Sequence, residues 1–320
     1  MSDKEKIAKV LIEEDYFVIG SHVGPDGDSL GGQLALSCFL DQMGKHYCIS
    51  SSDSKPTFSS HYRFLPNINS IKEHRECFEP RVFVALECPT PERLGVNLKM
   101  AKSAKTLLNI DHHGDNLNYG SLNWVNADAS SVSEMIFYLS AHLPVKITKQ
   151  IALYLYVGIV TDTGRFQYAN VKPSTFEVSK KLLELGLDTN YIFKQIYESR
   201  SFYSTLLLGE VMAKARFFPR SGLVYSSVNN EDFVLHNIDV GETEHFIDFL
   251  RAIKGVKIAA IFKEVTSTET KVSLRSTDGL DVAKVAEHFN GGGHPAASGY
   301  TSHKPLKQAI DDLIQLLESK

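Results

Sequence analysis

The chain has 320 residues, of which 43% are apolar, enough for a large packed core and for more than one average domain. A net charge of −4 with 12 histidines argues against a broad basic surface for nucleic acid, although one local pocket for a phosphorylated ligand remains compatible. No run is long and uncharged enough to cross a bilayer, and the cysteines lack the spacing of a zinc site. We therefore expect a cytoplasmic protein with no membrane partner, whose cysteines are reduced, buried thiols.

The first 200 residues alternate between predicted strands and helices. Apolar runs typical of buried strands lie at residues 16–20, 46–50, 82–86 and 106–110. Helical spacing is found at residues 7–12, from an N-cap at Asp28 or Ser29 to about Met43, and at 131–143, 148–160, 174–185 and 191–197. Strands that alternate with helices predict a parallel sheet with helices on both faces.

The chain changes character after residue 200. Residues 202–217 have the length and charges of a connecting helix, and the Gly/Pro turn at 219–222 follows it. The pattern then becomes strand, helix, strand, strand, helix, with 258–262 and 271–275 as antiparallel neighbours. We expect a smaller α/β domain with a mixed sheet. The predicted division is 1–200, 201–220 and 221–320.

Four polar clusters stand at the ends of predicted buried elements, where open α/β sheets bind their ligands. They are His22 with Asp26 and Asp28, Glu87 alone, Asp111 with His112 and His113, and Asp162 alone. Five carboxylates and three imidazoles gathered in one place would be costly to bury unless cations neutralised them. Mixed nitrogen and oxygen donors suit Mn²⁺, with Fe²⁺, Co²⁺ or Zn²⁺ as alternatives. So many donors predict two ions, which would activate a water and stabilise phosphoryl oxygens.

Each of these residues also has a purely structural interpretation. Asp28 could be only a helix N-cap, Asp26 an ordinary turn aspartate, and His22 a hydrogen-bonded structural histidine. Asp162 could merely end its helix. These interpretations would have to coincide at four element ends, so a metal centre is the better interpretation of the whole set.

Several motifs now resemble those of one family, the DHH phosphoesterases. They are His22-x-x-x-Asp26-x-Asp28, Asp111-His112-His113 and Asp162-Thr163-Gly164, in the family's order. Two later motifs, Ser273-Leu274-Arg275-Ser276 and Gly291-Gly292-Gly293-His294, resemble the DHH-associated C-terminal domain of the same superfamily. The length and layout are similar to those of nanoRNases, pAp phosphatases and cyclic-dinucleotide phosphodiesterases. RecJ-type exonucleases share the motifs but are larger.

The resemblance implies roles for the residues of the first domain. One Mn²⁺ would be held by His22 and Asp26, and the other by Asp28, His112 and Asp162, with Mg²⁺ as a further alternative. Glu87 stands where the family usually has an aspartate that bridges both ions, and this is the main departure from the family pattern. His113 would face the substrate phosphate as an acid or hydrogen-bond donor, and Asp111 would orient a neighbouring histidine.

In the second domain, the resemblance implies a substrate-binding set of Ser273, Arg275, Gly291, Gly292, Gly293 and His294. Glycines let the backbone approach a phosphate closely, and arginine can bind phosphate through two hydrogen bonds. A flexible loop after a helix is the structural alternative for the glycines. Asn290 stands where the family often has a further glycine.

These features predict a Mn²⁺-dependent phosphoesterase acting on short RNA or DNA oligonucleotides, linear or cyclic dinucleotides, or 3'-phosphoadenosine 5'-phosphate, in a cleft between the domains. Hydrolysis of phosphoanhydrides, as by pyrophosphatases or exopolyphosphatases of the same superfamily, is one alternative. A nucleotide-binding protein whose catalysis is weakened by Glu87 is another. The sequence leaves open which nucleotide is physiological and whether the chain forms a homodimer.

Overall fold

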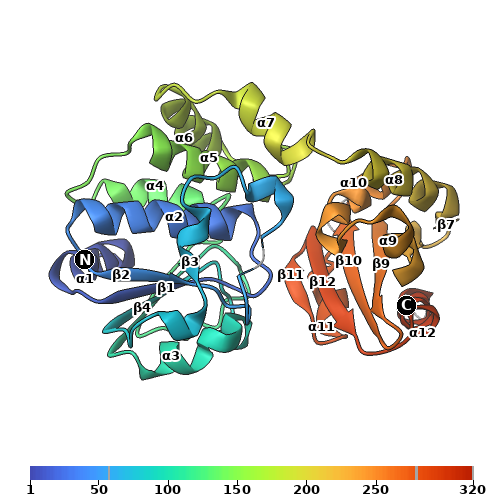
Figure 1. Ribbon diagram of the computed structural model, residues 1–320, viewed down its shortest axis with the longest axis horizontal. Coiled ribbons are helices and arrows are strands. Elements are labelled where there is room, and N and C mark those ends of the chain that lie inside the picture. The colour runs from blue at the N-terminus through green and yellow to red at the C-terminus, as the bar shows by residue number, and fades with distance from the viewer. Residues whose placement is uncertain (57, 278–279, 319–320) are drawn as a thin grey trace. The chain divides into compact units, whose positions relative to one another are not determined.

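The computed structural model describes residues 1–56, 58–277 and 280–318 of the protein. It divides into two compact units, Met1–Glu198 and Ser199–Lys320, each built on its own sheet (Figure 1). The predicted fold class is confirmed: the first sheet is parallel, and the second is mixed.

The first unit is organised around a six-stranded parallel sheet of order β3-β2-β1-β4-β5-β6. Its strands are β1 (Phe17–Gly20), β2 (Tyr47–Ser50), β3 (Ile71–Lys72), β4 (Val82–Leu86), β5 (Thr106–Asp111) and β6 (Leu122–Val125). The central strands β1 and β4 are buried along their whole length, as continuous apolar runs predict for a sheet that is covered on both faces.

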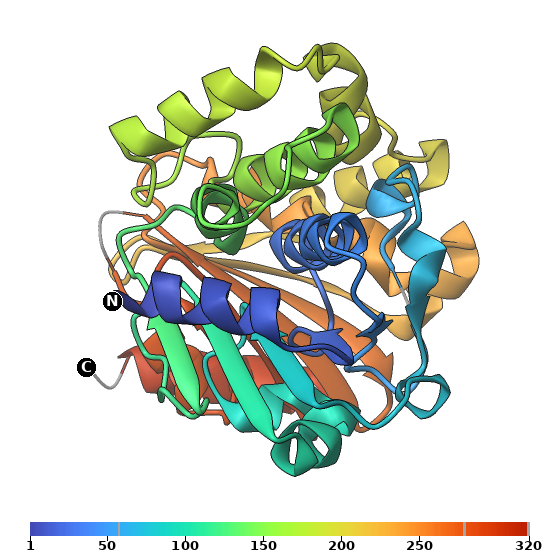
Figure 2. The same cartoon turned by 90° about the vertical axis from the view of Figure 1, so that its left-hand side faces the viewer.

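Helices cover both faces of this sheet (Figures 1 and 2). One face packs against α1 (Asp3–Glu13), α2 (Gly27–Gln42), α4 (Val132–Ser140) and α5 (Lys149–Asp162) in a single large core. The other face packs a smaller core against the 3₁₀ segment η4 (Pro91–Asn97) and α3 (Leu98–Ser103). The unit ends with α6 (Pro173–Leu183) and α7 (Thr189–Tyr197), and short 3₁₀ turns lie at Ser60–Tyr62, Ile68–Ser70 and His74–Glu76.

Glycines bring α2 and α5 unusually close together. A Cβ atom at Gly31 would collide with the carbonyl oxygen of Tyr154, and one at Gly158 would lie 2.6 Å from Oδ1 of Asp28. No larger residue would allow this approach without a shift of the backbone. The close packing holds the beginning of α2 beside the end of α5, and therefore brings two of the predicted polar clusters together.

The second unit has a six-stranded sheet of order β11-β12-β10-β9-β8-β7. Its strands are β7 (Arg216–Phe218), β8 (Leu223–Val228), β9 (Ile258–Thr266), β10 (Glu269–Ser276), β11 (Gly292–His294) and β12 (Ala297–Ser302). One core contains residues of α8 (Phe202–Lys214), α9 (Asn230–His236) and α10 (Phe246–Arg251), and the other contains residues of α11 (Ala283–Glu287) and α12 (Leu306–Glu318). A 3₁₀ turn, η5, spans Val240–Thr243. The helix that we expected to connect the domains, α8, thus packs on the second sheet.

The cysteines differ from our expectation. Cys48 at β2 and Cys77 after η3 (His74–Glu76) form a disulfide with their Cα atoms 5.8 Å apart, whereas Cys38 and Cys88 are free thiols. The expectation of four reduced thiols was therefore wrong, because only the folded chain brings these two distant positions together.

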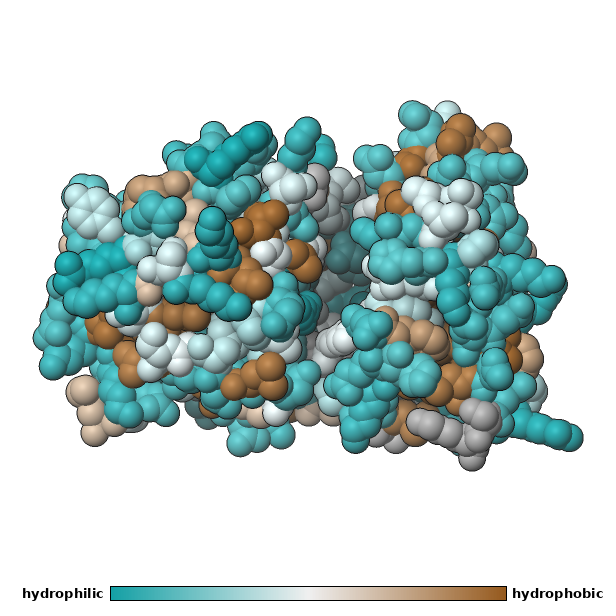
Figure 3. All heavy atoms as spheres, turned by 90° about the horizontal axis from the view of Figure 1, so that it is seen from below, coloured by the Kyte–Doolittle hydropathy of each residue, from teal (hydrophilic) through white to brown (hydrophobic). Residues whose placement is uncertain are grey.

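No helix within the described ranges has the length and apolar character of a membrane span. Hydrophilic side chains cover most of the face of each unit shown in Figure 3.

Candidate metal centre

Polar side chains follow three adjacent strands at the carboxyl end of the first sheet. β1 pairs with β4, and β4 pairs with β5, all in parallel. The chain leaves these strands toward His22, Glu87 and His112, so the sheet itself brings the three residues to one edge. This edge is where open α/β sheets bind ligands.

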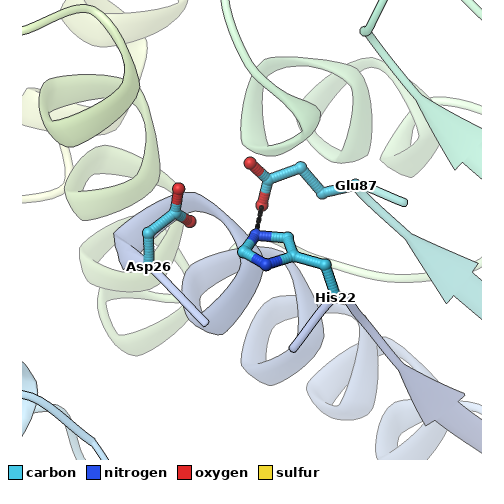
Figure 4. Close-up of side chains that lie close together, drawn as sticks. All are labelled: His22, Asp26 and Glu87. Atoms are coloured by element: carbon cyan, nitrogen blue, oxygen red, sulfur yellow. Dashed lines mark ion pairs between the residues drawn. The ribbon is translucent and has the colours of Figure 1, made fainter. Parts of the chain in front are cut away.

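The first ligand group contains His22, Asp26 and Glu87, whose candidate ligand atoms all lie within 4.8 Å of one another (Figure 4). Nδ1 of His22 lies 2.8 Å from the carbonyl oxygen of Val23, so Nε2 is the atom that approaches Oε2 of Glu87, at 3.7 Å. One oxygen of Asp26, the N-cap of α2, accepts a hydrogen bond from the amide of Ser29 at 3.0 Å. These contacts fix the side chains while keeping donor atoms directed at a common point.

The second ligand group contains Asp28, Glu87 and His112, again with their ligand atoms within 4.8 Å of one another. Nε2 of His112 also lies 3.5 Å from Oδ2 of Asp162, at the end of α5. Glu87 belongs to both groups. The structure thus brings the six residues that we predicted as metal ligands to one place, and it puts Glu87 between two sets.

Asp28 belongs to the second ligand group, and its carboxylate also accepts hydrogen bonds from the beginning of α4. We expected Asp28 or Ser29 to cap α2, but the N-cap is Asp26, and Asp28 lies in the first turn. The buried carboxylate of Asp28 instead accepts hydrogen bonds from the amides of Val132 at 2.6 Å and Ser133 at 2.8 Å, at the beginning of α4. The partial positive charge of a helix N-terminus stabilises a carboxylate in this position.

Asp111 is engaged by the protein rather than directed at a ligand group. Its Oδ1 lies 2.7 Å from Nδ1 of His113, and its Oδ2 accepts a hydrogen bond from Nδ2 of Asn116 at 2.5 Å. The backbone amide of His112 also donates to Oδ1, at 2.8 Å. These contacts orient His113, with Nδ1 as its donor. The supporting role that the resemblance implies for Asp111 is compatible with these contacts and stays a prediction.

The backbone at Glu87 is unusual. Its φ of 52° lies in the left-handed region, which a residue with a long side chain adopts only when its surroundings enforce it. The carbonyl oxygen of the next residue, Cys88, accepts hydrogen bonds from Asn109 at 3.2 Å, Asn116 at 3.4 Å and Tyr119 at 3.0 Å. These three donors hold the peptide between Cys88 and Pro89, and the amide of Glu87 itself donates to the carbonyl oxygen of Ile110 at 3.0 Å. The backbone is thus held on both sides of the Glu87 side chain.

The charges at this centre are not balanced by the protein. Burial, together with the carboxylates of Asp26 and Asp28, raises the pKa of Glu87 well above its ordinary value. Burial also raises the pKa of Asp162 to about 8, although His112 opposes this shift. Oε2 of Glu87 is buried without a hydrogen-bond donor among the described residues. Divalent cations would satisfy these oxygens, so the residues fit a pair of metal ions.

The histidines differ in charge for the same physical reasons. For His112, burial lowers the pKa, but the carboxylates of Asp162 and Asp28 outweigh it, and the pKa is raised. For His113, burial and then the charges of His112 and Arg93 lower the pKa well below its ordinary value. These influences favour the neutral form of His113 and the charged form of His112.

Two residues of the centre were missed from the sequence. Asn116 donates both to Asp111 and to the carbonyl oxygen of Cys88, and Arg93 of η4 acts electrostatically on His22 and His113. Both lie in irregular segments just after β4 or β5, and no periodicity marks them. The signal that could have found them is their nearness in sequence to Glu87 and to Asp111-His112-His113.

The second unit places Ser273 and Arg275 on one face of β10. Their neighbours across the sheet are Gly299 and Ala297 on β12, which face Gly292 and His294 on β11. Nη1 of Arg275 donates to the carbonyl oxygen of Leu274 at 3.0 Å, while its buried Nε lacks an acceptor among the described residues. The side chain of His294 lies outside the described part of the structure.

The three consecutive glycines Gly291, Gly292 and Gly293, at the beginning of β11, differ in the space around them. A Cβ atom at Gly291 would collide with the carbonyl oxygen of Gly299, and one at Gly293 would lie 2.6 Å from the carbonyl oxygen of Ala297. Both glycines are therefore required for the close approach of β11 to β12. A Cβ at Gly292 would meet nothing within 4 Å among the described atoms, so this position alone leaves open space. Asn290 has a φ of 59°, a conformation that asparagine tolerates better than most residues.

Comparisons with known proteins agree with this architecture. Residues 16–159 match the N-terminal domain model of the DHH family, and residues 222–320 match the DHHA1 domain model. The bifunctional oligoribonuclease and PAP phosphatase NrnA of Thermus thermophilus is 29% identical, over 98% of this chain and 93% of its own length. The protein of the same name from Bacillus subtilis is 26% identical, over 92% of each chain.

Solved structures agree with the fold. The crystal structure of an exopolyphosphatase-related protein from Bacteroides fragilis has a TM-score of 0.90 and 26% identity, with 99% of this chain and 96% of that chain covered. The structure of Thermus thermophilus RecJ in complex with Mn²⁺ has a TM-score of 0.57 and 13% identity. The match covers 100% of this chain and 54% of the RecJ chain. The likeness to RecJ concerns the fold alone.

Proposed function

The chain belongs to the DHH family of phosphoesterases, and from this premise we propose that it is a Mn²⁺-dependent enzyme that hydrolyses short oligonucleotides and 3'-phosphoadenosine 5'-phosphate. The observation that carries the proposal is the position of Glu87 in two groups of ligand residues at the carboxyl end of the parallel sheet. Mixed imidazole and carboxylate donors favour Mn²⁺, and the number of donors favours two ions.

The residues divide into those that would hold the ions and those that would act on the substrate. His22 and Asp26 would hold one ion, Asp28, His112 and Asp162 the other, and Glu87 would contribute to both. When bound, such a pair of ions supplies positive charge that stabilises the phosphoryl group in the transition state. His113, held by Asp111 with Nδ1 as its donor, presents Nε2 as the atom that exchanges a proton or hydrogen bond with a phosphate oxygen.

The substrate class is proposed from two kinds of support. Two relatives similar over nearly the whole chain are named as oligoribonucleases and PAP phosphatases, and these names describe those proteins. In this chain, Arg275 offers an Nε without an acceptor among the described residues, and Gly292, at the register of Ser273 on the same sheet, leaves open space. A guanidinium next to an accessible backbone suits a phosphate group. We propose that Ser273, Arg275, Gly292 and the neighbouring residues Gly291, Gly293 and His294 bind the nucleotide.

The decisive experiment measures hydrolysis by protein that has been stripped of metal and reloaded with Mn²⁺. Substrates are 3'-phosphoadenosine 5'-phosphate, pApA, pGpG, cyclic di-AMP and a ladder of short RNA, and the readout is release of mononucleotide or phosphate. Asp26→Asn and His112→Gln are expected to lose more than about 100-fold in rate. The matched control is Glu13→Gln, an exposed carboxylate at the end of α1, on the chain just before the amino end of β1. If the reloaded protein leaves every nucleotide intact, the proposal is wrong.

A second activity is favoured by one specific likeness. The Bacteroides fragilis protein of TM-score 0.90 is named exopolyphosphatase-related, so phosphoanhydride hydrolysis is the competing proposal. Pyrophosphate and polyphosphate belong in the same assay. A kcat/KM for either that exceeds the values for all nucleotides would favour the competing proposal.

A further inference from the structure

Arg93 is fixed beside the candidate metal centre by its backbone. Its carbonyl oxygen accepts a hydrogen bond from the amide of Val23, at 2.9 Å, and Val23 directly follows His22. Gly95, two residues later, has a φ of 52°, and a Cβ there would collide with the carbonyl oxygen of Ser52. The segment that carries Arg93 therefore packs tightly against the exits of β1 and β2, and this packing does not use the Arg93 side chain.

The guanidinium of Arg93 is close enough to both His22 and His113 to act on their charges. After burial itself, Arg93 is the next cause that lowers the pKa of His22, and it also lowers the pKa of His113. The side chain is half-buried. Among residues 1–56, 58–277 and 280–318, no carboxylate forms an ion pair with it. A half-buried cation that is paired with none of the described carboxylates is unusual, because an unpaired charge is costly to desolvate.

Arg93 differs in this respect from Arg81, which lies at the opposite end of the same region. Arg81 directly precedes β4, at the amino end of the strand, and it pairs with Glu14. Arg93 follows β4, at the carboxyl end, where the ligand groups lie.

We infer that Arg93 binds the non-bridging oxygens of the phosphate that is hydrolysed at this centre. Arginine offers two parallel N–H donors that match two phosphate oxygens, and its charge is independent of pH. The backbone contact between Val23 and Arg93 places this arginine beside the ligand groups of the first unit. This inference rests on the proposed function and adds a residue that binds the substrate of that function.

The experiment compares the parent protein with Arg93→Gln, Arg93→Lys and the control Arg81→Gln, all loaded with Mn²⁺. Three quantities are measured: KM and kcat for a dinucleotide, the inhibition constant of inorganic phosphate, and the dissociation constant of Mn²⁺. Arg93→Gln is expected to lose roughly 10- to 100-fold in kcat/KM and to bind phosphate more weakly by a similar factor. Arg93→Lys should recover part of the loss, and Arg81→Gln should match the parent.

Metal affinity separates substrate binding from a structural role. Removal of a nearby cation should leave the affinity for Mn²⁺ unchanged or raise it, whereas damage to the centre would lower it. The inference is overturned if Arg93→Gln keeps the parent's kinetics and phosphate inhibition, or if its loss of activity follows a loss of Mn²⁺. If the parent itself hydrolyses no nucleotide, the proposed function fails. Phosphate binding to the Mn²⁺-loaded parent and Arg93→Gln, measured by calorimetry, then decides the role of Arg93 separately.

Discussion

Nδ1 of His113 lies 2.7 Å from Oδ1 of Asp111, and this contact divides the roles within three consecutive residues. Both oxygens of Asp111 are engaged by protein donors, because Oδ2 accepts from Asn116. The carboxylate is thus placed to orient His113, while His112 turns Nε2 toward Asp162. We propose that these three consecutive residues divide into one metal ligand, His112, one residue that contacts the substrate, His113, and one support, Asp111.

The first prediction concerns this support. Asp111→Asn keeps the shape of the side chain, but it removes the charge and allows the amide to present a donor to His113. We expect the rate to fall roughly 10- to 100-fold, with a smaller fall for Asn116→Ala. Steady-state kinetics of both variants against the parent would check this. Parental activity in Asp111→Asn would mean that the Asp111–His113 contact has no part in catalysis.

The second prediction concerns Glu87→Asp. The left-handed backbone at Glu87 and the three donors on the Cys88 carbonyl direct a glutamate side chain at both groups. Aspartate is shorter by one methylene and would withdraw its carboxylate from them. We expect Mn²⁺ affinity to fall about 10-fold or more, without a gain in activity. If Glu87→Asp instead hydrolyses substrate faster than the parent, the alternative of a nucleotide-binding protein with weakened catalysis gains support.

The third prediction concerns the metal-free protein and pH. The pKa of Asp162 is raised from 3.8 to about 8, so the folded state binds a proton more tightly than the unfolded state. The stability from this proton is fully present below pH 3.8 and is lost as the pH rises through about 8. Without metal, the free energy of unfolding should therefore fall between pH 5 and 8.

Urea denaturation with a chelator or with Mn²⁺, at several pH values, measures this effect. Metal at about 100 times its dissociation constant should add roughly 3 kcal/mol and remove the decline toward pH 8. Asp162→Asn is the control, because it lacks the titrating group and should show a smaller decline without metal. An identical decline in Asp162→Asn and the parent would contradict the assignment to this carboxyl group.

The fourth prediction concerns Lys263, which lies on β9 opposite Lys271. The side chain is nearly fully buried, and burial lowers its pKa from 10.5 to about 8, with Glu244 opposing the shift. Below pH 8 the folded protein holds a buried ammonium that the unfolded chain keeps in water. This penalty is relieved as the pH rises from about 8 to 10.5.

Lys263→Met is therefore expected to be more stable than the parent at pH 7, by roughly 2–3 kcal/mol. Its advantage should shrink as the pH approaches 10. Chemical denaturation at both pH values tests this, with the exposed Lys271→Met as the control. An advantage of equal size at both pH values would assign the gain to packing rather than to charge.

Strong local signals made much of the fold predictable from the sequence. The continuous apolar runs of β1, β4 and β5 and the polar residues after them predicted both the parallel sheet and the gathering of candidate ligands. The short or half-buried strands β3, β6, β7, β11 and β12 were not predicted, and the expected helix at 202–217 ends at Lys214, before β7. The Cys48–Cys77 disulfide and the capping of α4 by Asp28 also escaped, since each joins positions that only the folded chain brings together.

The candidate site was less completely predictable than the fold. Histidine and aspartate residues at strand ends can be recognised from the sequence as candidate metal ligands. Arg93 and Asn116, in contrast, have no feature that distinguishes them from ordinary polar loop residues. Their positions depend on backbone contacts such as that between Val23 and Arg93. Gly31 and Gly158 likewise matter because they lack a Cβ atom, which lets α2 and α5 approach each other closely. A sequence pattern based on side-chain type does not reveal this contribution.

If both groups bind ions, as we propose, the shared position of Glu87 would make them thermodynamically dependent on each other. An ion in one group would fix the ionised state and the direction of a carboxylate that the other group also uses. Such coupling is reciprocal, so each ion changes the affinity for its neighbour by the same factor. A change confined to one group, for example at His22, is therefore expected to be felt by the ion beside His112. The pair then responds to the metal supply as one unit rather than as two independent sites.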